Sequence, residues 1–184
     1  PLAETHQKNQ VCDWVIAPAP VTQLVEATAY NIAASLLTKL SYVGVMTLEF
    51  FYGSDGLFVN EIAPRTHNSG HFSIEACSSS QFDQQLCIAA GLDVPNPEFI
   101  ADGSLMVNLL GLSADQAEPL EERLSKLRSI EALHVHWYGK DEIPGRKVGH
   151  VTTLLNGHTA DERTERGQQM LQIIREIWPL PLNW

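Results

Sequence analysis

Apolar and polar residues recur along the chain with two periods, one typical of helices and one typical of strands. Segments with apolar residues at helical spacing predict helices at 20–40, 81–90, 115–127 and from Thr159 onward. Short runs rich in β-branched and aromatic residues predict strands at 11–16, 42–52, 57–62, 105–110, 132–138 and 147–155. The small polar residues of 70–80 predict a loop. This mixture of elements predicts an α+β fold.

Two local signals mark where helices begin and end. Thr159 and Glu162 have the spacing of a capping box, in which each side chain binds the main-chain N–H of the other residue. Gly91 readily takes the left-handed conformation that ends many helices, so we expect the helix at 81–90 to stop there. Both signals are independent of the hydrophobic pattern.

The length and composition are those of a globular protein with one large or two small domains. The chain has 184 residues, of which 44% are hydrophobic, enough to build a core. The Pro-Asn-Pro sequence at 95–97 predicts a boundary between two domains, 1–97 and 98–184. The chain starts at Pro1 without an initiating Met, so we expect a fragment of a longer polypeptide.

Charge and cysteine content exclude several kinds of partner and cofactor. The net charge of −10 argues against binding to nucleic acid or to an anionic membrane surface. No apolar stretch approaches the roughly 18 residues of a membrane span. The 3 cysteines contain no Cys-x-x-Cys pair, which argues against a disulfide framework and a thiolate zinc site. We therefore expect a cytoplasmic protein.

The sequence Gly-Ser-Asp-Gly at 53–56 indicates a β-hairpin between the strands at 42–52 and 57–62. If 54–56 form a three-residue loop, the strands acquire a definite register. The resulting pairs are Gly53 with Leu57, Phe51 with Val59, and Glu49 with Glu61. Two carboxylates about 5 Å apart repel by about 3 kcal/mol at an effective dielectric constant of about 20. Because no Lys or Arg occurs from 41 to 64, a proton or a cation such as Mg²⁺ would have to relieve this repulsion.

Two other interpretations of this glutamate pair stay open. Glu49 and Glu61 could both lie on the solvated face of an antiparallel sheet, where their repulsion is screened. Carboxyl groups about 5 Å apart also suit a retaining glycoside hydrolase. The lack of a sugar-stacking aromatic cluster near the polar end of the hairpin argues against that activity.

The polar stretch at 60–71, which follows the second hairpin strand, concentrates residues suited to binding and catalysis. Arg65 is the one basic residue among 12 acidic ones from 41 to 122. Its guanidinium suits a planar oxyanion such as carboxylate, bicarbonate or phosphate. Alternatively, Arg65 forms a structural ion pair with Glu61 or Glu75.

His67, Asn68 and Ser69 follow Arg65 closely in this stretch. A single histidine is more often structural, but its neighbours here favour a role in binding. A zinc site is not expected, because His67 and His71 lack a third ligand.

Three basic residues, Lys140, Arg146 and Lys147, fall within eight positions of a predicted loop. In an acidic protein this cluster is a candidate binding site for an anion of phosphate size. The alternative is a solvated β-turn whose charges serve solubility. The chain has no Walker loop and no Gly-x-Gly-x-x-Gly sequence, so neither device holds phosphate here.

Five motifs carry a resemblance to a known family. They are VMTLEFF at 45–51, NEIAPR at 60–65, HNSGH at 67–71, YGK at 138–140 and GRKVGH at 145–150. Over essentially the whole chain, the sequence resembles the 5-(carboxyamino)imidazole ribonucleotide synthetases of the ATP-grasp superfamily. The glutamate pair is common to the superfamily, whereas the run at 63–71 is a much more specific part of the resemblance. Thr66 stands where the family usually has proline, which changes loop stiffness more than chemistry.

The resemblance implies which part of the enzyme this is. It would be the C-terminal half, comprising the second part of an ATP-grasp domain, with an antiparallel sheet and helices, and a small β-rich C-terminal domain. The family's N-terminal domain and first ATP-clamping sheet would be absent. We therefore expect weak or no catalysis from these 184 residues alone.

The resemblance also implies a reaction. ATP, bicarbonate and aminoimidazole ribonucleotide would give a carbamate, ADP and phosphate through carboxyphosphate, in de novo purine synthesis. The full-length enzyme would be a homodimer. Two alternatives are an ATP-grasp ligase with a different acceptor and a purely structural or dimerising module.

The implied site residues fall into three groups. Glu49 and Glu61 would bind Mg²⁺, and together with Asn60 they would bind ATP. Arg65, His67 and Asn68 would be catalytic, and with Ser69 they would orient the bicarbonate-derived group and the aminoimidazole. The ribonucleotide 5′-phosphate would be held by Lys140, Arg146 and Lys147.

Overall fold

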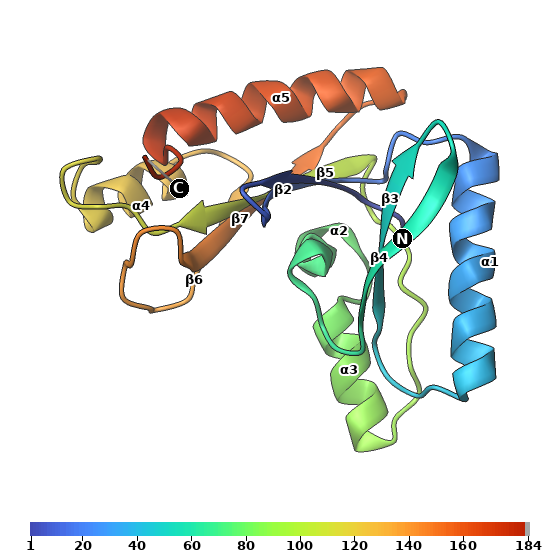
Figure 1. Cartoon of the computed structure of the whole chain (residues 1–184). Coiled ribbons are helices and arrows are strands. Elements are labelled where there is room, and N and C mark those ends of the chain that lie inside the picture. Colours follow the sequence, from blue (N-terminus) through green and yellow to red (C-terminus); the bar gives the residue numbers. More distant parts are fainter. Residues whose placement is uncertain (183–184) are drawn as a thin grey trace.

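The computed structural model describes residues 1–182 and shows an α+β chain built on a five-stranded antiparallel sheet (Figure 1). The strand order is β1-β2-β5-β7-β6. These strands are β1 (Glu4–Lys8), β2 (Val11–Ala17), β5 (Gly103–Leu110), β7 (Lys147–Leu155) and β6 (Leu133–Trp137). A separate antiparallel ribbon consists of β3 (Thr47–Gly53) and β4 (Gly56–Ala63). The predicted α+β fold with antiparallel sheets is thus confirmed.

One face of the large sheet is covered by α5 (Ala160–Ile177) and α4 (Leu120–Arg128). Strand β5 is buried along its whole length, which explains its nearly continuous apolar sequence. The core on this face includes Leu105, Val107, Leu109, Leu124, Leu127, Ile174 and Trp178. The Trp178 indole N–H donates to the Leu110 carbonyl at 2.7 Å, so this buried polar group is satisfied.

The opposite face packs against the segment that follows the ribbon. Phe72, Ala76 and Cys77 contact a second apolar cluster. Its sheet members are Cys12, Val15, Ala17 and Met106. Figure 1 shows the ribbon between α1 (Gln23–Leu40) and α3 (Gln81–Ala90), on the side of the sheet away from α5. The polar turn after β4 is therefore held against the large sheet.

Several predicted elements are confirmed at their ends. Strand β7 and helix α3 have the predicted bounds, and Gly91 follows α3 with a left-handed φ of 67°. The capping box at the start of α5 is present, with Thr159 and Glu162 each accepting from the other's main-chain N–H. These ends depend on local chemistry, which is why the sequence predicts them well.

Other predicted bounds are wrong. The strand predicted from 42 starts at Thr47, because Tyr42 bonds through its hydroxyl to the Val45 carbonyl and Gly44 has a φ of 148°. The helix predicted from 115 starts at Leu120, directly after a proline. The loop predicted at 70–80 overlaps a 3-10 helix (Asn68–Gly70) and contains the one-turn helix α2 (Ser73–Ala76). The polar edge strand β1 carried no apolar pattern and was not predicted.

The large sheet draws strands from both sides of residue 97. Strands β1 and β2 precede this position, whereas β5, β6 and β7 follow it. The division into 1–97 and 98–184 therefore does not coincide with separate sheets, and it stays a prediction. Within residues 1–182, no helix combines the length and apolar character needed to cross a membrane.

Candidate functional site

Glu49 and Glu61 face each other across the β3–β4 ribbon, as predicted. Directly opposed residues on neighbouring antiparallel strands point to the same side of the sheet. The Glu49 side chain is only 14% exposed and that of Glu61 is 50% exposed. The ribbon thus brings one shielded and one solvated carboxylate together.

The strand pairing between the turn and the two glutamates differs from the predicted pairing. The hairpin turn has two residues, so Gly53 pairs with Gly56 rather than Leu57, and Phe51 pairs with Phe58 rather than Val59. A β-bulge between Glu49 and Phe50 then adds one residue to the opposite strand, and this residue is Asn60. The bulge compensates for the shorter turn and restores the pairing of Glu49 with Glu61.

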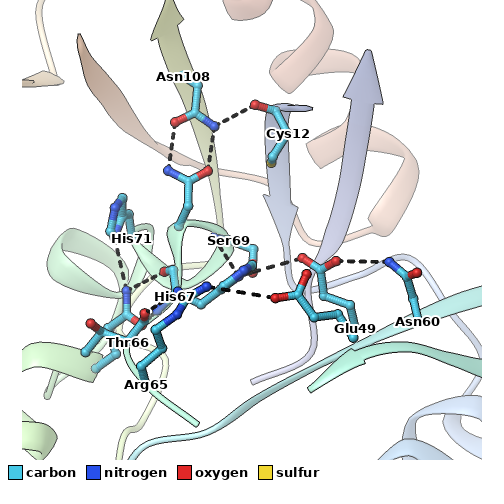
Figure 2. Close-up of polar contacts among 12 residues, drawn as sticks. Cys12, Glu49, Asn60, Arg65, Thr66, His67, Ser69, His71 and Asn108 are labelled. Atoms are coloured by element: carbon cyan, nitrogen blue, oxygen red, sulfur yellow. Dashed lines mark hydrogen bonds and ion pairs between the residues drawn. The ribbon is translucent and has the colours of Figure 1, made fainter. Parts of the chain in front are cut away.

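The surroundings of the two carboxylates are polar, and among residues 1–182 the only lysine or arginine paired with either of them is Arg65. Asn60 Nδ2 donates to Glu49 Oε2 at 3.3 Å, and His67 Nδ1 lies 3.7 Å from Glu49 Oε1 (Figure 2). Arg65 Nη2 lies 3.9 Å from Glu61 Oε1, on an exposed surface where such a pair contributes little. The mutual repulsion of the pair is therefore only weakly compensated by the protein.

Glu49 and Glu61 suit Mg²⁺ as ligands, but they are too few to hold a metal ion by themselves. Among residues 1–182, no group of three or more His, Cys, Asp or Glu side chains is arranged to hold a metal ion. Mg²⁺ is commonly bound by one or two carboxylates, with water and substrate phosphates completing its six ligands. Two glutamates at the edge of a cavity meet that requirement only when a phosphate is also present.

The acidic pair (Glu49 and Glu61) and the basic loop (Lys140, Arg146 and Lys147) are far apart in the sequence. Both line one cavity of about 470 Å³. The predicted site residues around it are Glu49, Glu61, His67, Lys140, Arg146 and Lys147. A second cavity of about 820 Å³ is lined by Asn60 and Ser69, and Glu49 is common to both. The smaller cavity combines both signs of charge, so it is the stronger candidate for a site that joins a metal and an anion.

Lys147 and Arg146 point in different directions. Lys147 is partly buried and donates from Nζ to Asn68 Oδ1 at 3.0 Å, and burial lowers the pKa of this lysine. Arg146 and Lys140 are exposed, and Lys140 Nζ lies 5.1 Å from the centre of the Tyr138 ring. The loop is therefore more than a solvated turn, because one of its cations is turned inward.

Arg65 is not among the residues that line the 470 Å³ cavity. Its side chain is exposed and donates from Nη1 to the Thr66 carbonyl at 3.0 Å. Of the two ion pairs considered from the sequence, the one with Glu61 is present at 3.9 Å, whereas Glu75 contacts His136 Nε2 at 2.6 Å. The predicted catalytic role of Arg65 therefore stays a prediction.

His67, Asn68 and Ser69 form the start of the 3-10 helix next to Glu49. His67 is its N-cap residue, and His67 Nδ1 lies 2.8 Å from Ser69 Oγ. Burial lowers the pKa of His67, an effect that the nearby Glu49 carboxylate partly offsets. Asn68 forms a reciprocal pair of hydrogen bonds with Asn108 on β5, both at 2.8 Å.

Gln81 fixes the backbone of this turn, a role that no sequence pattern predicted. Its Oε1 accepts from the His67 N–H at 2.8 Å, and its Nε2 donates to the His67 carbonyl at 2.8 Å. Nε2 also lies 3.1 Å from His71 Nδ1. As the first residue of α3, Gln81 carries no signal that distinguishes it from an ordinary helix start. Its role depends on the fold bringing α3 to the turn.

We expect Gly70→Ala to destabilise the protein by about 1–3 kcal/mol, the range typical of overpacking. A Cβ at Gly70 would lie 2.8 Å from Gln81 Oε1, which is held in place by the His67 backbone. Gly53→Ala is the matched control, because a Cβ there would meet nothing within 4 Å. Urea unfolding measures both variants. Equal free energies of unfolding for the two would contradict a rigid clamp by Gln81.

Three histidines stack on one another beside the turn: His71 directly after the 3-10 helix, His150 on β7 and His136 on β6. The ring centres of His71 and His150 are 4.8 Å apart, and those of His136 and His150 are 4.4 Å apart. The Tyr138 hydroxyl lies 2.7 Å from His150 Nδ1. Burial lowers the pKa of His150 to about 3 and that of His71 to about 4, and the neighbouring imidazoles act in the same direction. Both rings are therefore neutral at physiological pH.

The free energy of unfolding is expected to fall as the pH drops from about 6.5 to about 5. In this window His71 and His150 take up protons in the unfolded chain, where the pKa is about 6.5, but stay neutral in the folded protein. Because the unfolded state binds more protons, stability rises with pH, by at most about 1.4 kcal/mol per pH unit for each histidine. Urea unfolding across this range measures the slope. His71→Gln should reduce it, whereas the exposed control His134→Gln should not.

Two family models match different parts of the chain. The ATP-grasp domain family model matches residues 1–82, and the phosphoribosylaminoimidazole carboxylase C-terminal domain model matches residues 104–166. The chain is 46% identical over 182 residues to the N5-carboxyaminoimidazole ribonucleotide synthase of Synechococcus elongatus. That match covers 98% of this chain and 46% of the relative.

Solved structures show the same similarity. The N5-carboxyaminoimidazole ribonucleotide synthetase from Thermus thermophilus matches with a TM-score of 0.83 and 34% identity, covering 100% of this chain and 47% of that chain. The Aspergillus clavatus enzyme in complex with ADP and 5-aminoimidazole ribonucleotide matches with a TM-score of 0.79 and 31% identity, covering 95% of this chain and 46% of that one. The chain thus spans about half the length of the relatives it matches.

Proposed function

Because the chain belongs to the N5-carboxyaminoimidazole ribonucleotide synthetase family, within the ATP-grasp superfamily, we propose that the whole protein carboxylates 5-aminoimidazole ribonucleotide with ATP and bicarbonate. The observation that carries this proposal is the 470 Å³ cavity, where the opposed glutamates meet the basic loop. A metal-bound nucleotide and a phosphorylated acceptor need opposite charges, and this cavity provides both. The place of the reaction would be de novo purine synthesis in the cytoplasm.

The proposed reaction has two group transfers. A bicarbonate oxygen attacks the γ-phosphorus of ATP, ADP leaves, and carboxyphosphate forms. The amine of the aminoimidazole then attacks the carboxyl carbon, inorganic phosphate leaves, and the carbamate product remains. Both steps gain mainly from positioning and from neutralisation of negative charge.

On the metal side of the cavity, Glu49 and Glu61 would hold Mg²⁺. When bound, the ion would neutralise the negative charge of the ATP phosphates. The Asn60 amide holds one oxygen of Glu49 and so sets which oxygen remains available. Arg65, whose Nη2 lies 3.9 Å from Glu61 Oε1, would bind the bicarbonate-derived carboxyl group with its guanidinium.

On the acceptor side, the inward-turned Lys147 would bind the 5′-phosphate, and Lys140 and Arg146 would close over it from the exposed loop. Of the three turn residues, His67 lines this cavity, Ser69 lines the larger one, and Asn68 is bonded to Lys147. Because His67 lines the cavity next to Glu49, it would face the point at which the carboxyl group and the amine react.

The acceptor dependence of ADP release tests the proposal. The whole protein, supplied with Mg-ATP and bicarbonate, should release ADP much faster when 5-aminoimidazole ribonucleotide is added. No stimulation by this nucleotide would instead indicate an ATP-grasp ligase with another acceptor. Calorimetry with Mg-ATP then separates an enzyme from a structural module, because a module would release no heat. Sedimentation of the whole protein tests the proposed homodimer.

A further inference from the structure

The Asn108 side chain, in the middle of strand β5, is completely buried yet fully hydrogen-bonded. Its Nδ2 donates to the Cys12 carbonyl at 2.8 Å and to Asn68 Oδ1 at 2.8 Å, and its Oδ1 accepts from Asn68 Nδ2 at 2.8 Å. Figure 2 shows Asn108 above the turn, with its amide directed at Cys12 on one side. Because these contacts use both amide protons and the carbonyl oxygen, Asn108 has no proton left to donate to a substrate.

The chemistry of its neighbours leaves only one orientation for this pair of amides. The Cys12 carbonyl can only accept, so the amino group of Asn108 must face it. The Lys147 ammonium can only donate, and it lies 3.0 Å from Asn68 Oδ1. The Asn68 oxygen thus accepts from both Lys147 and Asn108, and one Asn68 N–H remains unused by these contacts.

The backbone of Asn108 is held as firmly as its side chain. Its carbonyl accepts from Arg175 Nη1 and Nη2, both at 3.4 Å, and Arg175 forms an ion pair with the buried Asp13. Helix α5 therefore anchors the position from the far side of the sheet. A residue with this many fixed contacts can impose its orientation on a partner in a more exposed turn.

We infer that Asn108 is a positioning residue that aligns Asn68 and Lys147 for an anionic group of the acceptor substrate. By occupying the Asn68 oxygen, it leaves Asn68 as a hydrogen-bond donor, which suits the oxygens of a phosphate or a carboxylate. By the same contact it keeps an acceptor in place for the Lys147 ammonium at the wall of the 470 Å³ cavity. The inference deepens the proposed function and rests on it for the identity of the substrate.

Asn108→Asp in the whole protein tests this role, because it keeps the shape of the side chain but removes its two donors. The carboxylate would face the Cys12 carbonyl and Asn68 Oδ1, both of which can only accept, and the repulsion between oxygens would force the Asn68 oxygen out of its present position. Asn68 Oδ1 would then no longer be available to Lys147. The KM for 5-aminoimidazole ribonucleotide is expected to rise about tenfold or more, while the KM for ATP changes by less than about twofold.

Two comparisons separate positioning from a general effect on structure or charge. Asn96→Asp adds the same charge at an exposed site and should leave both KM values unchanged. In a double-mutant cycle, Asn108→Asp should have little further effect on the acceptor KM once Asn68 is alanine. Independent, multiplying effects of the two substitutions, or an equal rise in both KM values, would overturn the inference.

Asn108→Ser provides a second variant in case the aspartate variant does not fold. Serine is too short to reach Asn68, and a water molecule can satisfy the Cys12 carbonyl. It should reproduce the rise in the acceptor KM. An acceptor KM equal to that of the wild-type protein would overturn the inference.

The same variant distinguishes a failure of this inference from a failure of the proposed function. If ADP release by the wild-type protein does not depend on 5-aminoimidazole ribonucleotide, the proposed function fails. NMR then decides the role of Asn108 through the side-chain amide protons of Asn68. Slow solvent exchange that Asn108→Ser abolishes supports positioning, whereas exchange as fast as that of exposed Asn96 contradicts it.

Discussion

Glu61→Gln is expected to abolish magnesium-dependent ATP cleavage by the whole protein while leaving its fold intact. The substitution removes one of the two carboxylates that face each other across the ribbon. Even residues that only support metal ligands typically cost about 10- to 100-fold when replaced, so loss of a proposed direct ligand should cost at least about 100-fold. ADP release at saturating ATP, measured over a range of Mg²⁺ concentrations, gives the effect.

The free energy of unfolding should not fall when the activity of Glu61→Gln is lost. This outcome distinguishes a metal ligand from a structural residue. Removal of one charge relieves the repulsion from Glu49, so the free energy of unfolding should stay the same or rise by up to about 1 kcal/mol. Glu131→Gln is the control, because Glu131 is exposed and outside the cavity. Normal ATP cleavage by Glu61→Gln would refute the metal-binding assignment of the pair.

Lys147→Met should raise the KM for 5-aminoimidazole ribonucleotide by about 10- to 150-fold, with a much smaller effect on ATP. Hydrogen bonds to charged groups contribute about 1.5–3 kcal/mol, and Lys147 is the basic loop residue that turns inward toward Asn68. Methionine preserves most of the chain volume but carries no charge. Steady-state kinetics with each substrate varied in turn measures the effect.

Arg146→Met is the matched comparison, since it removes the neighbouring charge from an exposed position. We expect a smaller rise in the acceptor KM than for Lys147→Met. Burial lowers the pKa of Lys147, so its charge is costly in the folded protein, and Lys147→Met should not reduce the free energy of unfolding. A larger kinetic effect at Arg146 would contradict the assignment of Lys147 as the main phosphate-binding residue.

The hairpin shows how much of a structure a local sequence pattern can predict. The strands, the turn and the pairing of Glu49 with Glu61 were all predicted, although the loop is one residue shorter than expected. The pairing survived because the bulge at Asn60 adds the residue that the shorter turn removes. No residue pattern near Asn60 predicts a bulge. A correct pair was thus predicted from a register that is wrong nearer the turn.

The residues that hold the site in place could not be predicted from local patterns in the same way. Asn108 is a single amide within the apolar run of β5, which signals an unusual buried group but not its partner. Its contact with Asn68 spans 40 positions, and the contact of Lys147 with Asn68 spans 79. Gln81 carries even less signal, since a polar residue at the start of a helix is common.

Short-range chemistry was sufficient for the helix caps, most strands, the opposed glutamates and the motifs that identify the family. Each of these depends on backbone preferences and side-chain spacing within a few residues, which the linear sequence contains in full. The inward turn of Lys147, the outward position of Arg65 and the amide pair of Asn68 and Asn108 required the folded chain. They depend on desolvation and on hydrogen bonds between segments whose approach is set by the packing of the ribbon and the turn against the large sheet.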